Sequence, residues 1–596
     1  MSKRPGGSRR EFLSTAAVLV AAGGRVPTDA RPDDAASSGP ANGRQDPSLT
    51  ETTVTEAAKL HALPLPPGSP AELVAALPGQ IAAVKAVRAV PRSLDLQPAI
   101  VFDPRLPGVR YPRQTNRLVL HAGRAAPLPT RDEDIAFAPV TQLARWIRTR
   151  RLTSRRLTEI YLDRIGRIDR TLFSWITVAT DLARRQADRA DAEIKAGRYR
   201  GPLHGIPYGI KDLFDTAGVA TTWGAAPYRD RIPDRDAAVV RQLAAAGAVL
   251  LGKLATGALA NGATWFGGQC RNPWNPDEPA GGSSTGSGSA TAAGLCAFSI
   301  GTDSLGSILN PADRCGVVGL RATFGRVPTA GAMPLTPSLD RIGPLTRSVE
   351  DAALVLAAIH GPDPTSATSV DMGFAYDATI DLRRITIGVD PAWFREVGFG
   401  PGASVPASEA HHRALAALRE LGVRVVDVAL PNRPYFALIN NLMVEAAAVF
   451  EELALSGRDR ELPEDNATAW PKSWRQARFL SAVDYLQFER LRRQVMIDFG
   501  TIFERVDLLF GPTYGSFELL MAMNFTGHPG LGVRAGFVET ATRGLGTVPL
   551  DPGGPKHRVT QNVAFHGRLY EEGKMLAVAR ALEARLGVAA ERPPVD

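Results

Sequence analysis

The chain has 596 residues, of which 44% are hydrophobic and 22% are charged, fractions typical of a soluble globular protein with a large core. Its net charge is +8, from 69 basic and 61 acidic residues. No cluster of Lys and Arg is interleaved with aromatic residues, so nucleic acid is not an expected partner. The three cysteines, Cys270, Cys296 and Cys315, match no zinc pattern, and their odd number argues against a complete set of disulfides.

The N-terminal segment has the pattern of a twin-arginine export signal. Ser8-Arg9-Arg10-Glu11-Phe12-Leu13 precedes the apolar run Ser14–Ala22. This run is too short to cross a bilayer as a helix of the mature protein, so we expect no stable membrane span. Residues 1–30 are therefore predicted to be a signal that directs export by the twin-arginine machinery to the periplasm or beyond. A disordered basic tail is the alternative.

Residues 31–134 are predicted to form a linker and an N-terminal extension. The stretch 31–47 is rich in Pro, Asp, Ser and Gly, as linkers are. Two short helices are predicted over 53–62 and 79–90. Prolines are too dense over 91–129 for much regular structure. The extension either packs on the main domain or shapes access to its site.

Residues 135–590 are predicted to form the main domain, in which helices and strands alternate. Thr153 or Ser154 can cap a helix with an apolar face. Gly247 ends a second helix and Gly422 a third. The remaining alternating elements are helices over 237–246 and 408–420 and strands over 248–251, 385–389, 423–428 and 506–510. Such alternation indicates an α/β fold with a largely parallel sheet.

A serine- and glycine-rich stretch, Gly281–Pro328, carries the chemistry. Its loop Ser304-Leu305-Gly306-Ser307 can place a nucleophilic hydroxyl beside several backbone N–H donors, as acyl transfer requires. Gly282–Gly286 also fits the G-x-S-x-G elbow, but the prolines before it make the required core strand improbable. A phosphate-binding loop is excluded because no Gly-Lys-Ser/Thr follows.

The run Gly281–Gly325 resembles the signature of the amidase signature family. Ser283 and Ser307 lie 24 residues apart, the spacing of that family's two catalytic serines. The segment Gly205-Ile206-Pro207-Tyr208-Gly209-Ile210-Lys211-Asp212 resembles the segment that carries its catalytic lysine. Weaker similarity covers Asp340–Asp351, Phe525–Pro529 and Ala564–Arg568, so the resemblance extends over residues 138–588.

The resemblance implies the amidase signature fold, with a mixed, mostly parallel central sheet covered by helices on both sides. It implies that Ser307 attacks a small-molecule amide while Ser283 relays the proton to neutral Lys211, without metal or cofactor. The backbone N–H groups of Ser304, Leu305 and Gly306 would form the oxyanion hole. The Gly282–Ser283 peptide bond would be cis. Lys211 can act as the base only if its pKa falls to about 7–8, which is equivalent to roughly 4 kcal/mol.

Two residues depart from the family pattern near the nucleophile. Leu305 stands where glycine is usual, in a loop whose backbone can require a glycine conformation. Leu309 replaces an arginine, which predicts a preference for uncharged acyl groups if its side chain faces substrate. The sequence leaves the choice of amide open.

Two other functions stay open at this point. One is a catalytically weak relative that only binds an amide-like ligand. The other is the A subunit of the tRNA-dependent amidotransferase, a glutaminase, against which the predicted export signal argues because its partners are cytoplasmic. A homodimer is compatible with the sequence, which does not determine the oligomeric state.

Overall fold

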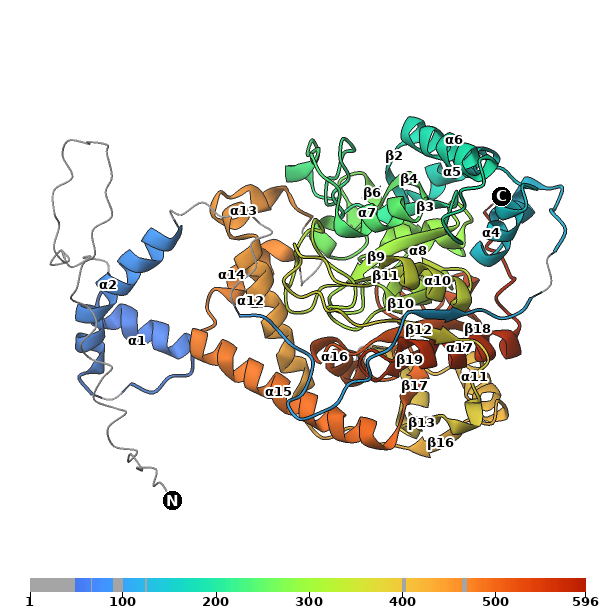
Figure 1. The fold of residues 1–596 in the computed structure, drawn as a ribbon. Helices are drawn as coiled ribbons and strands as arrows, with labels where there is room; N and C mark the ends of the chain where they lie inside the picture. Colours follow the sequence, from blue (N-terminus) through green and yellow to red (C-terminus); the bar gives the residue numbers. More distant parts are fainter. Residues whose placement is uncertain are drawn as a thin grey trace, which may run out of the picture. The chain divides into compact units, whose positions relative to one another are not determined.

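The structure, a computed structural model, describes residues 49–65, 67–88, 100–123, 126–398, 403–463 and 469–595. The chain divides into a small unit before Pro91 and a large unit from Pro91 onward (Figure 1). The predicted export signal and the 31–47 linker lie outside the described residues. The described residues between 100 and 134, which we assigned to the extension, fall in the large unit.

The described residues of the small unit form two helices that pack on each other, α1 (Glu51–Leu60) and α2 (Ser69–Arg88). The hydroxyl of Thr50 accepts a hydrogen bond from the N–H of Thr53 at 3.1 Å and so caps α1. Helix α2 begins ten residues before the predicted start at Gly79 and contains Pro78. A start after Pro78 is expected because proline removes a helical hydrogen bond, yet this helix continues through it.

The large unit is built on an eleven-stranded sheet in the order β16-β13-β17-β19-β18-β10-β11-β9-β3-β4-β2. Its strands are β2 (Trp175–Val178), β3 (Pro207–Lys211), β4 (Val249–Leu254), β9 (Phe298–Asp303), β10 (Val318–Arg321), β11 (Arg341–Thr346), β13 (Thr386–Val389), β16 (Arg424–Asp427), β17 (Leu508–Pro512), β18 (Gly530–Ala541) and β19 (Lys556–Gly567). Four two-stranded pairs also occur in the described residues: β1 (Arg117–Val119) with β12 (Ala375–Asp377), β5 (Thr264–Trp265) with β6 (Gly268–Gln269), β7 (Arg271–Asn272) with β8 (Asn275–Pro279), and β14 (Glu396–Gly398) with β15 (Ser404–Pro406).

The α/β class and the mixed sheet are confirmed, but the expectation of a mostly parallel sheet is wrong. Parallel pairing occurs in β16-β13-β17 near one edge and in β9-β3-β4 near the other. The six remaining neighbour pairs are antiparallel. The strand-helix alternation is visible only at the two ends of the domain, whereas the centre is made by hairpin-like returns such as β18 to β19.

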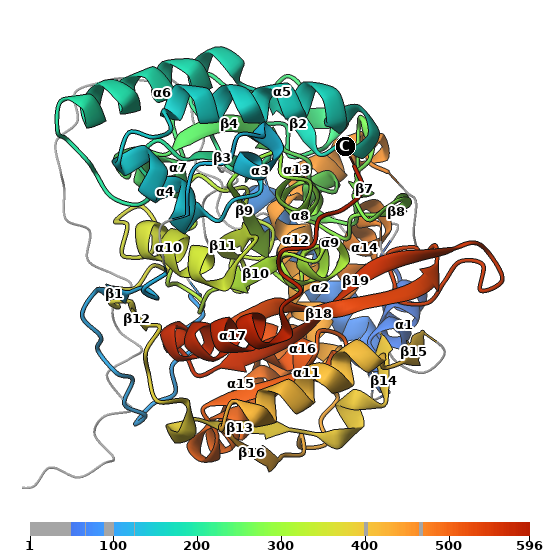
Figure 2. The same ribbon diagram turned by 90° about the vertical axis from the view of Figure 1, so that its right-hand side faces the viewer.

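Helices cover both faces of this sheet. In Figures 1 and 2, α10, α11 and α17 lie on one side, and α12, α15 and α16 lie on the other. The helices of the large unit are α3 (Asp132–Ala136), α4 (Val140–Arg148), α5 (Ser154–Leu172), α6 (Thr180–Lys195), α7 (Ala238–Ala245), α8 (Thr285–Ala292), α9 (Leu309–Cys315), α10 (Val349–Ile359), α11 (Glu409–Glu420), α12 (Ile439–Val449), α13 (Glu451–Leu455), α14 (Trp470–Ala477), α15 (Ala482–Arg505), α16 (Phe517–Phe525) and α17 (Glu572–Leu586).

The helix cap and the helix ends predicted from the sequence are confirmed. The Thr153 hydroxyl accepts from the N–H of Arg156 at 3.0 Å and caps α5. Gly247 and Gly422 follow α7 and α11 with φ of 80° each, a left-handed conformation that favours glycine. Strand β8 pairs only with β7 among the described residues, so the proline-rich run does not enter the main sheet.

Residues 100–123 form an extended strap on the large unit, and β1 is the one strand in its described part. The ring of Phe102 lies between Phe324, with ring centroids 5.1 Å apart, and the guanidinium of Arg492, 3.5 Å above its centroid. β1 adds a parallel pair to β12. The sequence left open whether this stretch packs on the main domain or shapes access to its site. The contacts of Phe102 and β1 show that the strap packs on the main domain.

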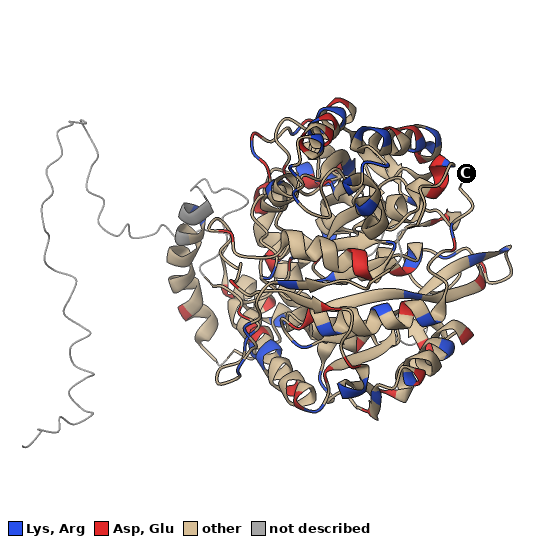
Figure 3. Ribbon diagram, turned by 45° about the vertical axis from the view of Figure 1, so that its right-hand side comes forward, with Lys and Arg blue, Asp and Glu red and all other residues tan. Residues whose placement is uncertain are grey.

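Charge is mixed along the described part of the chain. Basic and acidic positions are interspersed along the helices visible in Figure 3 rather than gathered by sign. Within the described ranges, no helix combines the length and hydrophobicity needed to cross a membrane.

Replacing Phe102 by alanine is expected to lower the free energy of unfolding by about 1–3 kcal/mol, because the cation–π and aromatic contacts are lost together. Urea denaturation measures the change. Val101→Ala is the matched control, since Val101 belongs to the same strap and is 50% exposed. Equal stability losses in the two variants would show that the strap contributes nothing specific through Phe102.

Candidate active site

Lys211 is the last residue of β3, between β9 and β4, and its side chain is fully buried. Its Nζ donates hydrogen bonds to Ser283 Oγ and Thr302 Oγ1, both at 2.8 Å. Among the described residues no carboxylate forms an ion pair with this amine. Burial lowers the pKa of Lys211 to about 7, although the negative charges of Asp303 and Asp340 act in the opposite direction.

Ser283 lies in the loop before α8 and is also buried, with 1% of its surface exposed. The Gly282–Ser283 peptide bond is cis, as the resemblance implies. The N–H of Gly282 donates to Asn310 Oδ1 at 2.6 Å, and the Ser283 carbonyl accepts from the N–H of Gly257 at 3.2 Å. A Cβ on residue 282 would lie 2.1 Å from the Gly262 carbonyl oxygen, so this close approach requires glycine.

Ser307 lies between β9 and α9 and is half-buried. Asp303 fixes this turn, because its Oδ1 accepts from the N–H of Gly306 at 2.7 Å and its Oδ2 from the N–H of Ile308 at 2.8 Å. The N–H of Ser284 donates to the Ser307 carbonyl at 3.2 Å. The loops that carry the two predicted catalytic serines are therefore joined directly.

The structure brings together one half of the predicted proton relay. Lys211 and Ser283 are hydrogen-bonded, whereas the hydroxyls of Ser283 and Ser307 are not bonded to each other. Catalytic hydrogen bonds are commonly long before substrate is bound and tighten in the complex. The backbone contact between Ser284 and Ser307 holds the two serine loops together.

The predicted oxyanion hole needs correction at Gly306. Its N–H already donates to Asp303 and is not free to bind an oxyanion. The N–H groups of Ser304 and Leu305 donate to no described residue and stay candidates, together with that of Ser307 itself. Leu305 does not adopt a positive φ, whereas Gly306 does, at 84°. The glycine conformation falls at residue 306, which is why leucine is accommodated at 305.

Three polar residues of the site were not singled out from the sequence: Thr302, Asp303 and Asp340. Asp340 precedes β11 and accepts hydrogen bonds from the Ser304 hydroxyl and from the N–H groups of Leu335 and Thr336, the last two at 2.8 and 2.9 Å. Burial raises the pKa of Asp340 to about 6. Thr302 and Asp303 lie inside the signature stretch, so their position alone could have identified them as residues of the site. The contact between Asp340 and Ser304 joins distant segments and left no local signal.

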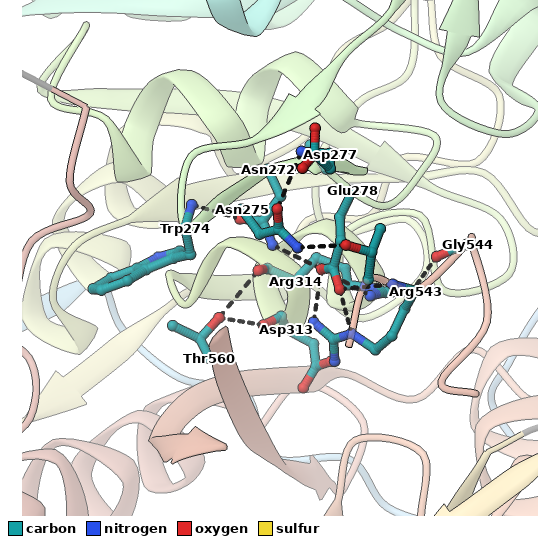
Figure 4. A network of polar contacts seen from close by, with 12 residues as sticks. Asn272, Trp274, Asn275, Asp277, Glu278, Asp313, Arg314, Arg543, Gly544 and Thr560 are labelled. Carbon is teal, nitrogen blue, oxygen red and sulfur yellow. Dashed lines mark hydrogen bonds and ion pairs between the residues drawn. The ribbon is translucent and has the colours of Figure 1, made fainter. Parts of the chain in front are cut away.

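A buried ionic network supports the hairpin before Ser283 (Figure 4). Glu278 accepts from Arg543 Nε and Nη2, both at 2.9 Å, and forms an ion pair with Arg314 Nη1 at 3.3 Å. Burial alone would raise the pKa of Glu278, but the two guanidinium groups hold it below its ordinary value. Because Arg314 belongs to α9, this network ties the segment before Ser283 to the helix after Ser307.

A cavity of about 730 Å³ reaches Thr302 and Ser304 from the surface. A wider hollow of about 930 Å³ over α5 and α6 contains none of the predicted site residues. Leu309 is 1% exposed and packs with Val397, Tyr514 and Leu520, so its side chain lies in the core and does not line this cavity.

Groups of three or more His, Cys, Asp or Glu side chains that could hold a metal ion do not occur in the described part of the chain. His528 and His566 are buried, and burial lowers the pKa of both. The hydroxyl of Thr526 pairs with Nδ1 of His528 at 2.7 Å. We therefore assign these two histidines no part in the site.

Sequence comparison finds relatives over most of this chain. A protein from a Roseiflexus species, named as the A subunit of glutamyl-tRNA(Gln) amidotransferase, is 33% identical over 438 residues, covering 66% of this chain and 89% of the relative. The protein of the same name from Anaeromyxobacter dehalogenans is 34% identical over 467 residues, covering 73% and 94%.

Solved structures agree on the fold. The peptide amidase from Stenotrophomonas maltophilia is 30% identical, with a TM-score of 0.64 over 77% of this chain and 98% of that protein. A bacterial aryl acylamidase shares the fold with a TM-score of 0.64 at 23% identity. Residues 156–528, which include Lys211, Ser283 and Ser307, match the sequence profile of the family described as amidase. The chain belongs to the amidase signature family, whose enzymes act on carbon–nitrogen bonds.

Proposed function

We propose that this enzyme hydrolyses a carboxylic amide to an acid and an amine through an acyl-enzyme on Ser307. The observation that carries the proposal is the buried amine of Lys211, hydrogen-bonded to Ser283 and without a carboxylate partner among the described residues. Burial lowers the pKa of this amine to about 7, so a substantial fraction is neutral at pH 7 and can accept a proton. An ordinary structural lysine would be exposed or paired.

In the first step the Ser307 oxygen attacks the amide carbonyl carbon. Its proton passes to Ser283, and the Ser283 proton passes to the neutral amine of Lys211. The oxyanion that develops is stabilised by the N–H groups of Ser304, Leu305 and Ser307. Asp303 keeps this turn in place by holding the N–H groups on both sides of Ser307.

In the second step the carbon–nitrogen bond breaks. The proton returns from Lys211 through Ser283 to the leaving nitrogen, which departs as a free amine. Water then attacks the ester on Ser307, with Ser283 and Lys211 again accepting the proton, and the acid is released. The relay needs no group outside Ser307, Ser283 and Lys211.

The relatives that are named as amidotransferase A subunits support a second candidate, a glutaminase that supplies ammonia to a partner protein. The two candidates share the relay and differ in the amide they accept. Release of glutamate from free glutamine would favour the second candidate. Absence of glutaminase activity in an enzyme that hydrolyses other amides would favour the first.

We also infer export by the twin-arginine route from the pattern Ser8-Arg9-Arg10-Glu11-Phe12-Leu13. An exported enzyme would meet its substrate outside the cytoplasm. This location supports a small-molecule amide rather than a tRNA-bound one as the substrate.

Ser307→Ala is expected to abolish amide hydrolysis, with roughly a 10⁴-fold or larger loss of kcat. Lys211→Ala and Ser283→Ala should each lose roughly 10²–10⁴-fold, because proton transfer fails. Since the residues act as a unit, the double variant Lys211→Ala/Ser283→Ala should be little worse than either single variant. Steady-state kinetics measure these losses.

The matched control for the triad variants is Ser289→Ala. Ser289 is a buried serine of α8 whose hydroxyl donates to the Arg271 carbonyl and does not contact Lys211. It should retain nearly full activity. Near-normal hydrolysis by Lys211→Ala at neutral pH would rule out lysine as the base.

The pH dependence of kcat/KM should show activity rising through about pH 7, because Lys211 acts in its neutral form and burial lowers its pKa to about 7. The charge of Asp340 raises the pKa of Lys211. Asp340→Asn should therefore shift this limb to lower pH, whereas Asp340→Glu, which keeps the charge, should leave it nearly in place. An unchanged midpoint in Asp340→Asn would contradict the assignment of the limb to Lys211.

Arg9→Lys combined with Arg10→Lys is expected to trap the protein in the cytoplasm as a longer precursor, since the export machinery reads the arginine pair. Cell fractionation with immunoblotting locates the protein. A lysine substitution keeps the charge, so it tests the arginine pair itself. Normal export of the double variant would refute the signal assignment.

A further inference from the structure

The 730 Å³ cavity ends beside the base of the proposed reaction. Thr302 and Ser304 line it, and Thr302 Oγ1 accepts a hydrogen bond from Lys211 Nζ at 2.8 Å. The cavity therefore reaches within one side chain of the lysine amine. Its volume falls in the range of small-molecule sites, about 300–1,000 Å³.

Five buried apolar side chains line this cavity. They come from four separate segments of the chain: Leu213, Trp223, Met333, Leu335 and Ile342. All five side chains are at most 5% exposed and lie in the main core, so the walls are held by packing. A site of this kind stabilises an apolar group by removing its surface from water.

The charged side chains that line this cavity have polar partners. Arg235 pairs with Asp234 at 3.5 Å, and the carboxylates of Asp236 and Asp340 accept hydrogen bonds from backbone N–H groups. Arg341 donates to Asn524 Oδ1 at 2.8 Å.

Arg231 binds Asp215 at 2.7 Å, and Arg241 binds Asp363 at 2.7 Å. The guanidinium of Arg231 also lies over the ring of Trp223, 4.4 Å from its centroid. A charged substrate group would have to compete with these partners, whereas an uncharged group would not.

The position of the cavity next to Lys211 indicates which part of the substrate it holds. The proton that Lys211 has accepted returns through Ser283 to the leaving nitrogen, so this nitrogen must lie on the lysine side of the scissile carbon. Thr302, which accepts a hydrogen bond from Lys211, lines the cavity, so the cavity offers space next to the lysine. Ammonia, the leaving group of a primary amide, is about the size of water and would leave this volume unused.

We propose that the cavity binds an uncharged apolar substituent on the leaving nitrogen, so that the substrates are N-aryl or N-alkyl amides. This inference rests on the proposed function. Ser307 forms the acyl ester, the carbon–nitrogen bond breaks, and the nitrogen leaves with the relayed proton as a primary amine R–NH₂. Water then releases the acid and restores Ser307.

Two amides with the same acyl group test the proposal: hexanamide and N-benzylhexanamide. Benzylamine is close to ammonia in basicity, so the comparison isolates the substituent on nitrogen. The wild-type enzyme is expected to show a kcat/KM for the N-benzyl amide at least about tenfold above that for the primary amide. A primary-amide preference would overturn the proposal.

Filling the cavity should remove that preference. Ala332→Trp, and Ala367→Trp at the exposed rim, each add bulk to a cavity-lining residue. Each is expected to lower kcat/KM for N-benzylhexanamide by about tenfold or more and to change that for hexanamide by less than about twofold. Ala584→Trp, on an exposed position of α17 away from the cavity, is the matched control and should alter neither.

The primary amide reports on the catalytic groups and on folding in every variant. Equal losses for both substrates in Ala332→Trp and Ala367→Trp would mean that the cavity holds the shared acyl part, which overturns the proposal. Hydrolysis of hexanamide alone by the wild type would leave the proposed function standing and refute only the leaving-group assignment. Failure on every amide would refute the proposed function, and this inference with it.

Discussion

The burial of the Lys211 amine is the constraint on which the site depends. Removing an ammonium group from water without a carboxylate in direct ion-pair contact disfavours its charged form, so burial makes the amine a base near neutral pH. The amine is not left without partners, because two hydroxyls, those of Ser283 and Thr302, lie 2.8 Å from it. Asp303 and Asp340 limit the loss of basicity through their charge, without forming an ion pair with the amine.

The fold supplies this arrangement by placing β3 beside β9. Lys211 ends β3, and Thr302 and Asp303 end β9, so parallel pairing brings the base and the nucleophile loop to the same edge. Ser283 arrives from outside the sheet, on a loop held by Gly257 and Asn310 and backed by the Glu278 network. The active site therefore depends on backbone contacts between loops as much as on the sheet.

Much of this arrangement could be predicted from the sequence, because its signals are local. The spacing of Ser283 and Ser307 and the segment around Lys211 identified the family, and helix caps such as Thr153 were visible in the sequence. The antiparallel centre of the sheet could not be predicted, because pairings such as β10 with β18 join segments about 200 residues apart. The Asp340–Ser304 contact likewise joins separate segments, whereas the Gly306 N–H donates to Asp303, three residues before it, within one local turn. Leu309 is a different case. It departs from the family pattern two residues after the nucleophile, but its side chain is packed in the core and does not reach the cavity.

The most direct test of the account is covalent labelling by a fluorophosphonate, which reacts with a serine only when its hydroxyl is activated as a nucleophile. The purified enzyme is treated with the reagent, and the modified residue is identified by peptide mass spectrometry. The account predicts one adduct per chain, on Ser307, with loss of amide hydrolysis in proportion to labelling. An active enzyme that is labelled on Ser283 or another residue, or that stays unlabelled, would contradict it.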